Sequence, residues 1–375
     1  MEVIVDGFIY QQQRFGGVSR IFTEILPRMC QLDPALHITM LMSGRSRQEP
    51  PQHPGIRKRS LFPIDDLLRP RRLWAPIQRP ARRLVQQLAL DSLPEAVWHS
   101  TYFTLPMNWN GCTVVTVYDM IYELFPEYFP SEKDEKFRQQ KLSSVLAADK
   151  IICISATTRK DVECYYGIDG NKLQAIPLAY NQDFRQLGRN DCAHELINKK
   201  PFLLYIGRRS HYKNFKTLLQ AYCVWQRRNE VEMLVVGSDW SEVERKWLAD
   251  QGCMEQVRLL RDVSDHELAC LYSNAAAFVY PSLYEGFGIP LLEAMACGCP
   301  IVASHIPSTM EVAGEQPFYF EAEDIDSLLE ALNAALLEGR RPEKVESGIK
   351  RAQQYSWDSC AEKTLQVYHS LVDAG

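Results

Sequence analysis

The feature that most constrains the fold is a recurring series of short, continuous apolar runs separated by longer amphipathic segments. Runs of this kind are typical of strands that are buried on both faces of a parallel sheet. The amphipathic segments, such as 131–148 and 213–228, predict helices between the strands, and this alternation indicates doubly wound α/β units. We expect strands at residues 3–5, 37–41, 96–98, 113–117, 150–154 and 173–176, and a second series at 202–206, 232–236, 257–260, 277–279 and 300–303.

The strand rhythm breaks near residues 177–200, a polar stretch close to the middle of the chain of 375 residues. A chain of this length is too long for one ordinary core and suits two packed domains. We predict Rossmann-like domains over 1–180 and 181–356 that face each other across a cleft, with a helix within 357–375 as a candidate for packing back on the first. Ligands of such sheets bind outside the carboxyl ends of the strands, so the cleft is the predicted place of the chemistry.

Cysteine usage and hydropathy bear on the compartment. The 11 cysteines are dispersed and form no Cys-x-x-Cys pair, which favours reduced thiols over a disulfide framework or a zinc site. The N-terminus shows no secretory signal, and no apolar run approaches the ~18–20 residues that span a bilayer. We therefore expect a cytoplasmic protein.

The net charge is −5, but the charge is unevenly distributed along the chain, and one segment is strongly basic. Between Arg45 and Arg83 there are eleven Lys and Arg residues against three acids, so this segment carries +8 and the remainder −13. Its bases alternate with leucines and a tryptophan, a pattern that suits an amphipathic stretch on an anionic membrane surface. A solvated face or a cradle for a charged substrate is an equally good interpretation. Nucleic acid is not expected as a partner, because the rest of the chain would repel it.

Two loops that follow expected strands carry glycines or cations at a helix start. Gly16 and Gly17 open a helical pattern after the first strand, where bare backbone N–H groups can approach an anion, although a plain turn explains them equally well. The loop after residues 202–206 places Arg208 and Lys213 before another helix. A planar guanidinium and a compact ammonium at a helix start suit a diphosphate, and an exposed basic loop is the alternative.

The third motif runs from Glu285 to Glu293, after the strand expected at 277–279. Gly286 and Gly288 leave the backbone bare on both sides of an aromatic residue, and a proline then opens a helix whose N-terminus can bind a phosphate. We expect Glu285 in the loop and Glu293 in the first turn of the helix, where both can accept hydrogen bonds from sugar hydroxyls. The alternative is a tight turn with a carboxylate that compensates the helix dipole.

Together, these motifs resemble those of the retaining glycosyltransferases of family four, which have the GT-B fold. The Glu-x7-Glu pattern is specific when it follows a Pro-Ser strand end, as it does here. The resemblance covers nearly the whole chain and is strongest over 203–320. The matching segments are 16–20, 205–208 with 213–214, 285–293, and 303–304 with 311–314.

Carried over position by position, the resemblance implies roles for these residues. Arg208 and Lys213 would neutralise the donor diphosphate and stabilise the departing nucleotide, and Gly17 would lie beneath the diphosphate. Glu293 would hold the ribose hydroxyls, and Glu285 a hydroxyl of the transferred sugar. The backbone that approaches the phosphates and the sugar would be that of Gly286, Phe287, Gly288 and Ile289.

The acceptor side departs from the family pattern. Many members carry a histidine after the strand that corresponds to 113–117, where this chain has Tyr118 and then Asp119. A phenol can still hydrogen-bond a sugar hydroxyl, and the Asp119 carboxylate can orient an acceptor or accept its proton. Arg20 and His99 are further acceptor-side candidates, although a lone histidine at a strand end is more often structural.

The resemblance implies transfer of a hexose from a nucleotide-diphosphate sugar to a glycan or lipid-linked glycan. Mannose from a GDP-linked donor is the first expectation, because residues 118–130 are similar to mannosyltransferase relatives, and a UDP-linked glucose is the second. We expect a same-face substitution and no cofactor, and no metal because an Asp-x-Asp motif does not follow any apolar strand. The alternatives are a nucleotide-sugar 2-epimerase and a non-catalytic nucleotide-sugar-binding relative.

Overall fold

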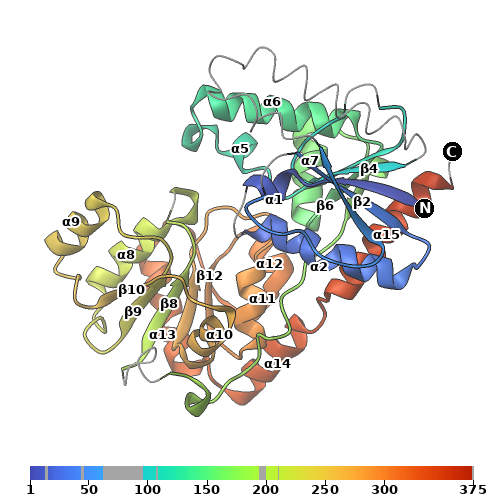
Figure 1. The fold of residues 1–375 in the computed structure, drawn as a ribbon. Helices are drawn as coiled ribbons and strands as arrows, with labels where there is room; N and C mark the ends of the chain where they lie inside the picture. Colours follow the sequence, from blue (N-terminus) through green and yellow to red (C-terminus); the bar gives the residue numbers. More distant parts are fainter. Residues whose placement is uncertain are drawn as a thin grey trace. The chain divides into compact units, whose positions relative to one another are not determined.

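The computed structural model describes residues 1–12, 16–43, 46–61, 96–106, 109–193, 200–209 and 211–373. The chain divides into two compact units (Figure 1). Unit 1 consists of Met1–Leu178 with Trp357–Gly375, and unit 2 of Ala179–Ser356. The sequence analysis placed the first of these divisions after residue 180, two residues later than the structure does.

Unit 1 contains a seven-stranded parallel sheet in the order β3-β2-β1-β4-β5-β6-β7. The chain starts at β1 in the interior of the sheet, runs outward to β3, returns to β4 and continues to β7 at the other edge. Strands β4 and β5 are buried along their whole length, as expected where both faces are covered. The strands are β1 (Glu2–Asp6), β2 (His37–Ser43), β3 (Ile56–Leu61), β4 (Val97–Ser100), β5 (Thr113–Val117), β6 (Lys150–Cys153) and β7 (Leu173–Ala175).

Helices cover both faces of this sheet. Helix α2 leads from β1 toward one edge and α7 from β6 toward the other, so right-handed crossovers place them on opposite faces. Helix α15 packs beside α2 (Figure 1), and Arg28 on α2 pairs with Asp358 on α15 at 3.0 Å. The helices are α1 (Phe8–Gln12), α2 (Gly17–Leu32), α5 (Ile121–Leu124), α6 (Glu132–Ala147), α7 (Ala156–Tyr166) and α15 (Trp357–Val372), with 3-10 turns η1 (Pro126–Tyr128) and η2 (Gly170–Lys172).

Unit 2 contains a six-stranded parallel sheet in the order β10-β9-β8-β11-β12-β13. Its strands are β8 (Phe202–Ile206), β9 (Glu232–Val236), β10 (Val257–Leu260), β11 (Ala277–Tyr280), β12 (Ile301–Ser304) and β13 (Phe318–Phe320). The helices are α8 (Phe215–Val224), α9 (Glu242–Asp250), α10 (Asp265–Asn274), α11 (Ile289–Ala296), α12 (Pro307–Ala313), α13 (Ile325–Glu338) and α14 (Pro342–Ala352), with 3-10 turns η3 (Arg189–Asp191) and η4 (His211–Lys213). One apolar core joins α8 and α13 to the sheet.

All eleven expected strands occur, and the structure adds two edge strands, β3 and β13. Strand β3 has the sequence Ile-Arg-Lys-Arg-Ser-Leu. Because three of its six residues are charged, a search for apolar runs does not detect it. Charged side chains are a common protection of a sheet edge against further pairing. The first part of the basic segment between Arg45 and Arg83 therefore contributes strand β3, and the part from residue 62, on which the membrane-surface interpretation and its alternatives rest, lies outside the described residues.

Two further findings concern the hydropathy of the helices and the positions of the cysteines. In the described part of the chain, no helix is long and apolar enough to cross a membrane. The structure places Cys192 beside Cys270 and Cys223 beside Cys253, within reach of disulfide formation, and the expectation of reduced thiols stays a prediction. The partners are separated by 78 and 30 residues, and short-range spacing cannot reveal such pairs.

Candidate functional site

The sheet of unit 2 reverses its order between the neighbouring strands β8 and β11. From β8 the chain continues to β9 and β10 on one side, and from β11 it continues to β12 and β13 on the other. Ligands of open parallel sheets bind at such a switch point, outside the carboxyl ends of the strands. The loops that follow these two strands contain Arg208, Lys213 and Glu285, so the fold brings these predicted residues to one place.

Lys213 and Glu285 form an ion pair across the switch point. The Lys213 Nζ lies 2.5 Å from Glu285 Oε1, and the Ser282 hydroxyl donates to the same oxygen at 2.6 Å. The two side chains are 21% and 13% exposed, so the pair is held by the protein yet remains open to a ligand. Burial raises the pKa of Tyr280 far above its ordinary value, and the nearby Glu285 charge acts in the same direction. The Lys213 ammonium and the Ser282 hydroxyl both contact Glu285 Oε1, and these two contacts hold the carboxylate beside the ammonium.

The turn between Glu285 and helix α11 is shaped by glycine. Gly288 has a φ of 119°, and a Cβ there would lie 3.0 Å from Leu291 Cδ1. A larger residue would therefore have an unfavourable backbone conformation and also a close contact with Leu291. Phe287 points into the protein, is 3% exposed and meets the Tyr355 ring edge-on at 5.8 Å. The helix begins at Ile289, two residues earlier than expected. A helix N-terminus with its amide donors therefore directly follows the Lys213–Glu285 pair.

Glu293 lies in the second turn of α11, and the prediction that places it in the first turn is wrong. The side chain is 4% exposed, and the Tyr272 hydroxyl donates to its Oε2 at 3.2 Å. Burial raises the pKa of Tyr272 well above its ordinary value, so this phenol stays a donor. A surface carboxylate that only balances a helix dipole would not be buried and oriented in this way.

The two arginines after β8 have different environments. Arg208 is exposed, and its backbone carbonyl accepts a hydrogen bond from the Tyr205 hydroxyl at 2.5 Å, which fixes the loop that carries this side chain. Arg209 is instead engaged inside the unit: it pairs with Glu244 at 2.6 Å, donates to the carbonyls of residues 238 and 239, and stacks on Trp240 at 4.5 Å. Of these two arginines, Arg208 is therefore the one whose side chain is open to a ligand.

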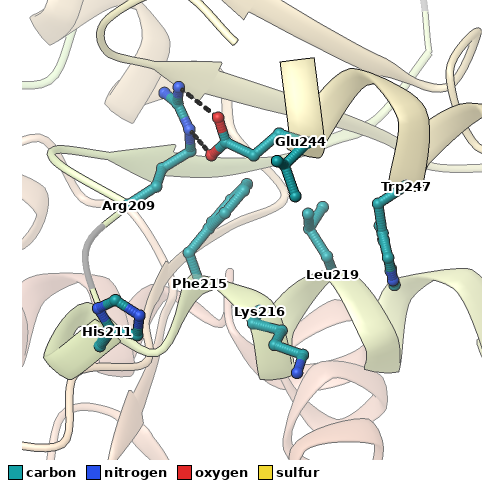
Figure 2. A pocket seen from close by; sticks show the side chains of 8 residues that line it. Arg209, His211, Phe215, Lys216, Leu219, Glu244 and Trp247 are labelled. Atoms are coloured by element: carbon teal, nitrogen blue, oxygen red, sulfur yellow. Dashed lines mark hydrogen bonds and ion pairs between the residues drawn. The ribbon is translucent and has the colours of Figure 1, made fainter. Parts of the chain in front are cut away.

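The Arg209–Glu244 pair also borders a pocket of about 420 Å³ between α8 and α9 (Figure 2). Apolar side chains, among them Leu219 and Trp247, form much of its lining. Its full lining is Arg209, His211, Phe215, Lys216, Leu219, Val243, Glu244 and Trp247. This pocket was not predicted from the sequence, because the loop after β8 supplies only Arg209 and His211 and the other lining residues come from α8 and α9.

In unit 1, Gly17 is the exposed first residue of α2. A Cβ at Gly17 would meet no atom of the described residues within 4 Å, so internal packing does not require a glycine there. Ser19 donates from its hydroxyl to the carbonyl of Gly16 at 3.0 Å, and the backbone N–H of Arg20 donates to the same oxygen at 3.1 Å. The helix start is thus well defined, and the half-buried Arg20 follows on its first turn.

Tyr118 and Asp119 directly follow strand β5, as expected from the sequence. The Tyr118 hydroxyl donates to the Thr101 carbonyl at 2.7 Å, and the residue is only 7% exposed. Burial, followed by the charge of Asp6, raises the pKa of Tyr118 well above its ordinary value. The half-buried Asp119 accepts from the Ile121 amide at 3.1 Å at the start of α5. The phenol is therefore engaged inside unit 1, and the carboxylate is the more open of the two groups.

His99 lies in β4 with 1% of its surface exposed. Its Nδ1 is 2.5 Å from the Tyr368 hydroxyl on α15, and its Nε2 is 2.8 Å from the Thr116 hydroxyl on β5. Burial lowers the pKa of His99 to about 3, so the ring is neutral near pH 7. Both nitrogens are occupied, and we assign His99 to the core of unit 1 and not to an acceptor contact.

Asp6 is a polar residue at a strand end that the sequence analysis missed. It ends β1, is 6% exposed and accepts hydrogen bonds from the Thr101 amide at 3.1 Å and the Phe8 amide at 3.4 Å. Burial raises the pKa of Asp6 to about 6, against the effect of the Thr101 hydrogen bonds. The available signal was an acid directly after the apolar run at residues 3–5.

Two family models match the chain. The model described as Glycosyltransferase Family 4 matches residues 15–184, and the model described as Glycosyl transferases group 1 matches residues 189–354. The chain is a glycosyltransferase. The two matches meet close to the division between unit 1 and unit 2. The predicted enzyme class, a glycosyltransferase, is confirmed.

Sequence relatives of this glycosyltransferase include two enzymes of O-antigen synthesis. The O-antigen chain mannosyltransferase B of Escherichia coli is 29% identical over 299 residues, which cover 76% of this chain and 77% of the relative. The O-antigen chain mannosyltransferase RfbU of Salmonella typhimurium is 29% identical over 236 residues, or 62% of this chain and 63% of the relative.

Solved structures share the fold over the full length. Sucrose-phosphate synthase from Thermosynechococcus elongatus has a TM-score of 0.78 at 20% identity and covers 100% of both chains. WaaG, a glycosyltransferase involved in lipopolysaccharide biosynthesis, has a TM-score of 0.71 at 15% identity, covering 98% of this chain and 99% of WaaG. The Anabaena protein HepE in complex with UDP-glucose has a TM-score of 0.72 at 14% identity, covering 99% and 100%. The predicted GT-B fold class is confirmed.

Proposed function

We propose that this glycosyltransferase moves a hexose, mannose first, from a nucleotide-diphosphate sugar to a glycan or lipid-linked glycan with retention of configuration. The observation that carries the proposal is the Lys213–Glu285 ion pair at the β8/β11 switch point, next to the exposed Arg208. The two relatives named as O-antigen chain mannosyltransferases support mannose and a glycan acceptor. The HepE complex with UDP-glucose supports a nucleotide-sugar donor.

In this proposal the ion pair is the resting state of the donor site. A diphosphate competes with Glu285 for the Lys213 ammonium, and Arg208 adds a planar fork that fits phosphate oxygens. The Glu285 carboxylate can then accept a hydrogen bond from a hydroxyl of the sugar. Glu293, oriented by Tyr272, is placed to accept from the ribose hydroxyls. The amides at the start of α11 add donors that need no side chain.

The chemistry we propose is a same-face substitution. The bond between the anomeric carbon and the β-phosphate oxygen breaks, and the acceptor hydroxyl oxygen forms a bond to the anomeric carbon from the same side. The acceptor proton passes to the leaving phosphate, and Asp119 orients the acceptor. Arg208 and Lys213 stabilise the charge that develops on the phosphate, which is the contribution expected from preorganised cations in a transferase site. We propose on this basis that turnover does not require a metal.

Two measurements test the function. A thermal-shift screen against GDP, UDP, ADP and their mannose and glucose derivatives should identify the donor, because a ligand of the folded state raises the Tm. Nucleotide release from that donor should then depend on an added mannoside acceptor and persist in EDTA. Loss of activity in EDTA with recovery in Mg²⁺ would refute the metal-independent mechanism. Release of nucleotide and isomerised sugar without an acceptor would identify a 2-epimerase instead.

Replacement of Glu285 by Gln separates an enzyme from a binding protein. The amide cannot hold the Lys213 ammonium by charge, so kcat should fall on the order of 100-fold, the range seen when one positioned electrostatic group is removed. The matched control is E338Q at the end of α13, where a half-exposed acid pairs with Arg341 at 3.3 Å. Equal turnover in E285Q and E338Q would favour a non-catalytic relative.

We also propose that the basic segment between Arg45 and Arg83 attaches a cytoplasmic protein to an anionic membrane surface. Bases interleaved with apolar residues bind such surfaces at about 1 kcal/mol per charge. A vesicle-sedimentation assay of the triple variant R69A/R71A/R72A tests this, with vesicles of neutral lipid as the control. Unchanged sedimentation of the variant with anionic vesicles would refute the attachment.

A further inference from the structure

The pocket of about 420 Å³ between α8 and α9 contains none of the residues proposed to hold the donor (Figure 2). Helix α8 lines it with Phe215 and Leu219, which are four residues apart, and α9 lines it with Val243 and Trp247, which are also four apart. Residues at this spacing lie on the same face of a helix, so each helix presents one apolar ridge to the pocket. We call the space between the two ridges the α8–α9 slot.

The walls of the α8–α9 slot are held in place at both ends. At the start of the two helices, Arg209 Nε donates to Glu244 Oε1 at 2.6 Å and so fastens the loop after β8 to α9. Near the ends of the same helices, the Cα atoms of Cys223 on α8 and Cys253 after α9 are 6.3 Å apart. A slot with fixed walls needs little rearrangement to admit a ligand, and most small-molecule sites are formed in advance in this way.

The charged pair that borders the slot already has its hydrogen bonds within the protein. Both oxygens of Glu244 accept from Arg209, and one of them also accepts from the Ser241 amide at 2.7 Å and the Ser241 hydroxyl at 2.8 Å. Arg209 donates in addition to the carbonyls of residues 238 and 239. A ligand body with its own donors and acceptors would lose its bonds to water here without replacing them. The slot therefore favours bare hydrocarbon over a nucleoside or a sugar ring.

The open side of the slot is marked by Val243, which is 79% exposed, and by a cation. Lys216 is an exposed residue of α8 that lines the pocket on the side away from the Arg209–Glu244 pair (Figure 2). Because the Glu244 charge is balanced by Arg209, the Lys216 ammonium is the charge that an incoming ligand meets. An ammonium at the entrance of an apolar slot favours a ligand with a negative end.

We propose that the α8–α9 slot binds a single hydrocarbon chain, acyl or prenyl, whose anionic head contacts Lys216. The chain displaces water from Phe215, Leu219 and Trp247, and the phosphate or carboxylate head stays at the rim beside the ammonium. This lipid site is separate from the proposed donor site, because Arg208, Lys213 and Glu285 do not line the slot. Its occupation is therefore measurable without turnover and without any nucleotide sugar.

The first test is calorimetry of the full chain with hexyl, octyl, decyl and dodecyl phosphate, each kept below the concentration at which it forms micelles. Each methylene that enters the slot should tighten binding about fourfold, which corresponds to ~0.8 kcal/mol, and the gain should end once the slot is full. Decanoate shows whether a carboxylate head serves as well as a phosphate. Decyltrimethylammonium has the same chain with a positive head, and we expect it to bind roughly threefold or more weakly than decyl phosphate.

Two pairs of variants locate the chain and its head. Val243→Glu places a carboxylate at the entrance and should weaken decyl phosphate binding at least tenfold, whereas Val224→Glu changes a valine that is 65% exposed at the end of α8, outside the lining, and should leave the Kd unchanged. Lys216→Ala should weaken decyl phosphate roughly two- to fivefold, the range of an exposed ion pair, without affecting uncharged decanol. Lys246→Ala, an exposed lysine of α9 outside the lining, should affect neither ligand.

Tryptophan fluorescence gives a direct position for the chain. Decyl phosphate with a terminal bromine should quench the fluorescence of the wild type, because bromine quenches an indole that it contacts. The quenching should decrease in Trp247→Phe, which keeps an aromatic ring in the slot. It should persist in Trp109→Phe, which removes an indole from unit 1 and serves as the control.

The proposal would be refuted if no alkyl phosphate bound the wild type saturably, which is also the result expected of a slot that receives only a side chain of a partner protein. Equal binding of decyl phosphate by Val243→Glu and Val224→Glu would refute it as well. So would binding that is lost in Lys213→Gln and kept in Lys216→Ala, because the phosphate would then occupy the donor site. Failure of the proposed function appears separately, as absence of nucleotide release from every donor in the wild type.

Discussion

The burial of His99 makes the stability of unit 1 sensitive to acid. His99 joins β4 to β5 through Thr116 and to α15 through Tyr368, at 2.8 Å and 2.5 Å. Burial lowers the pKa of this histidine from 6.5 to about 3. Between these pH values the unfolded chain binds a proton that the folded protein does not, so stability is present above pH 6.5 and is lost as the pH falls.

The size of the stability loss follows from the pKa shift of His99. A difference of about 3.5 pKa units at 1.36 kcal/mol each gives roughly 5 kcal/mol over the whole interval. At pH 5 only the unfolded form is protonated to a large extent, and the loss relative to neutral pH is about 2 kcal/mol. Asp6 acts in the opposite direction, because its pKa is raised to about 6 and its contribution grows as the pH falls through this value. The assay must therefore compare the wild type with a variant in which only His99 is replaced.

The assay measures unfolding of unit 1 by peptide-resolved hydrogen exchange in urea, at pH 7 and pH 5, because two units do not unfold as one. His99→Gln has a similar size and an amide that can bond both hydroxyls. We expect the wild type to lose about 2 kcal/mol more than this variant between the two pH values, with the Asp6 contribution common to both. The control His369→Gln removes a half-exposed histidine of α15 and should keep the wild-type loss. An equal loss in wild type and His99→Gln would refute the reasoning.

Three further predictions concern the charged groups of both units. Lys213→Gln should raise the Kd for the nucleoside diphosphate roughly tenfold or more, measured by calorimetry, because it removes a cation that contacts phosphate. Arg208→Ala should weaken the same binding without loss of stability, whereas Arg209→Ala should cost about 2–3 kcal/mol in urea denaturation, since Arg209 makes several charged hydrogen bonds inside the unit. The pair Lys141–Glu123 lies at 2.8 Å with both side chains 1% exposed. Glu123→Gln alone should therefore cost about 3–5 kcal/mol, and the double change to Met and Leu should cost less by the same measurement.

The sequence predicts the interior strands well and the edge strands poorly. Strands such as Thr113–Val117 and Phe202–Ile206 occur with the expected bounds. A short, continuous apolar run is stable mainly where both of its faces are buried, as they are in the interior of a parallel sheet. Strand β3 carries Arg57 and Arg59 at a sheet edge, where no burial demands an apolar pattern. Strand β13 has three residues and is too short for a periodicity to appear.

Site residues were predictable where chemistry and chain position coincide. Lys213 and Glu285 follow two strands that the fold places side by side, so strand-end motifs were enough to predict that these two side chains lie close together. The role of Arg209 could not be found in this way, because its partner Glu244 comes from another helix and only the folded unit brings them together. The burial of Tyr118 likewise depends on a backbone carbonyl 17 residues away, which a motif does not contain.

Each sheet has a switch point, which in unit 1 lies between the hydrogen-bonded neighbours β1 and β4, and the charges at the two points differ. Unit 2 gathers Lys213 and Arg208 around its switch point, and a diphosphate requires such cations because its own charge is concentrated on a few oxygens. Unit 1 places the carboxylate of Asp6 and threonine hydroxyls at the equivalent position, where the same diphosphate would be repelled. At the switch point of unit 2 the Lys213 ammonium is already paired with the Glu285 carboxylate, so a diphosphate there competes with one acid only. Because the Asp6 carboxylate belongs to the other sheet and is held there by amides and hydroxyls, it is not a second acid at the site of the two cations.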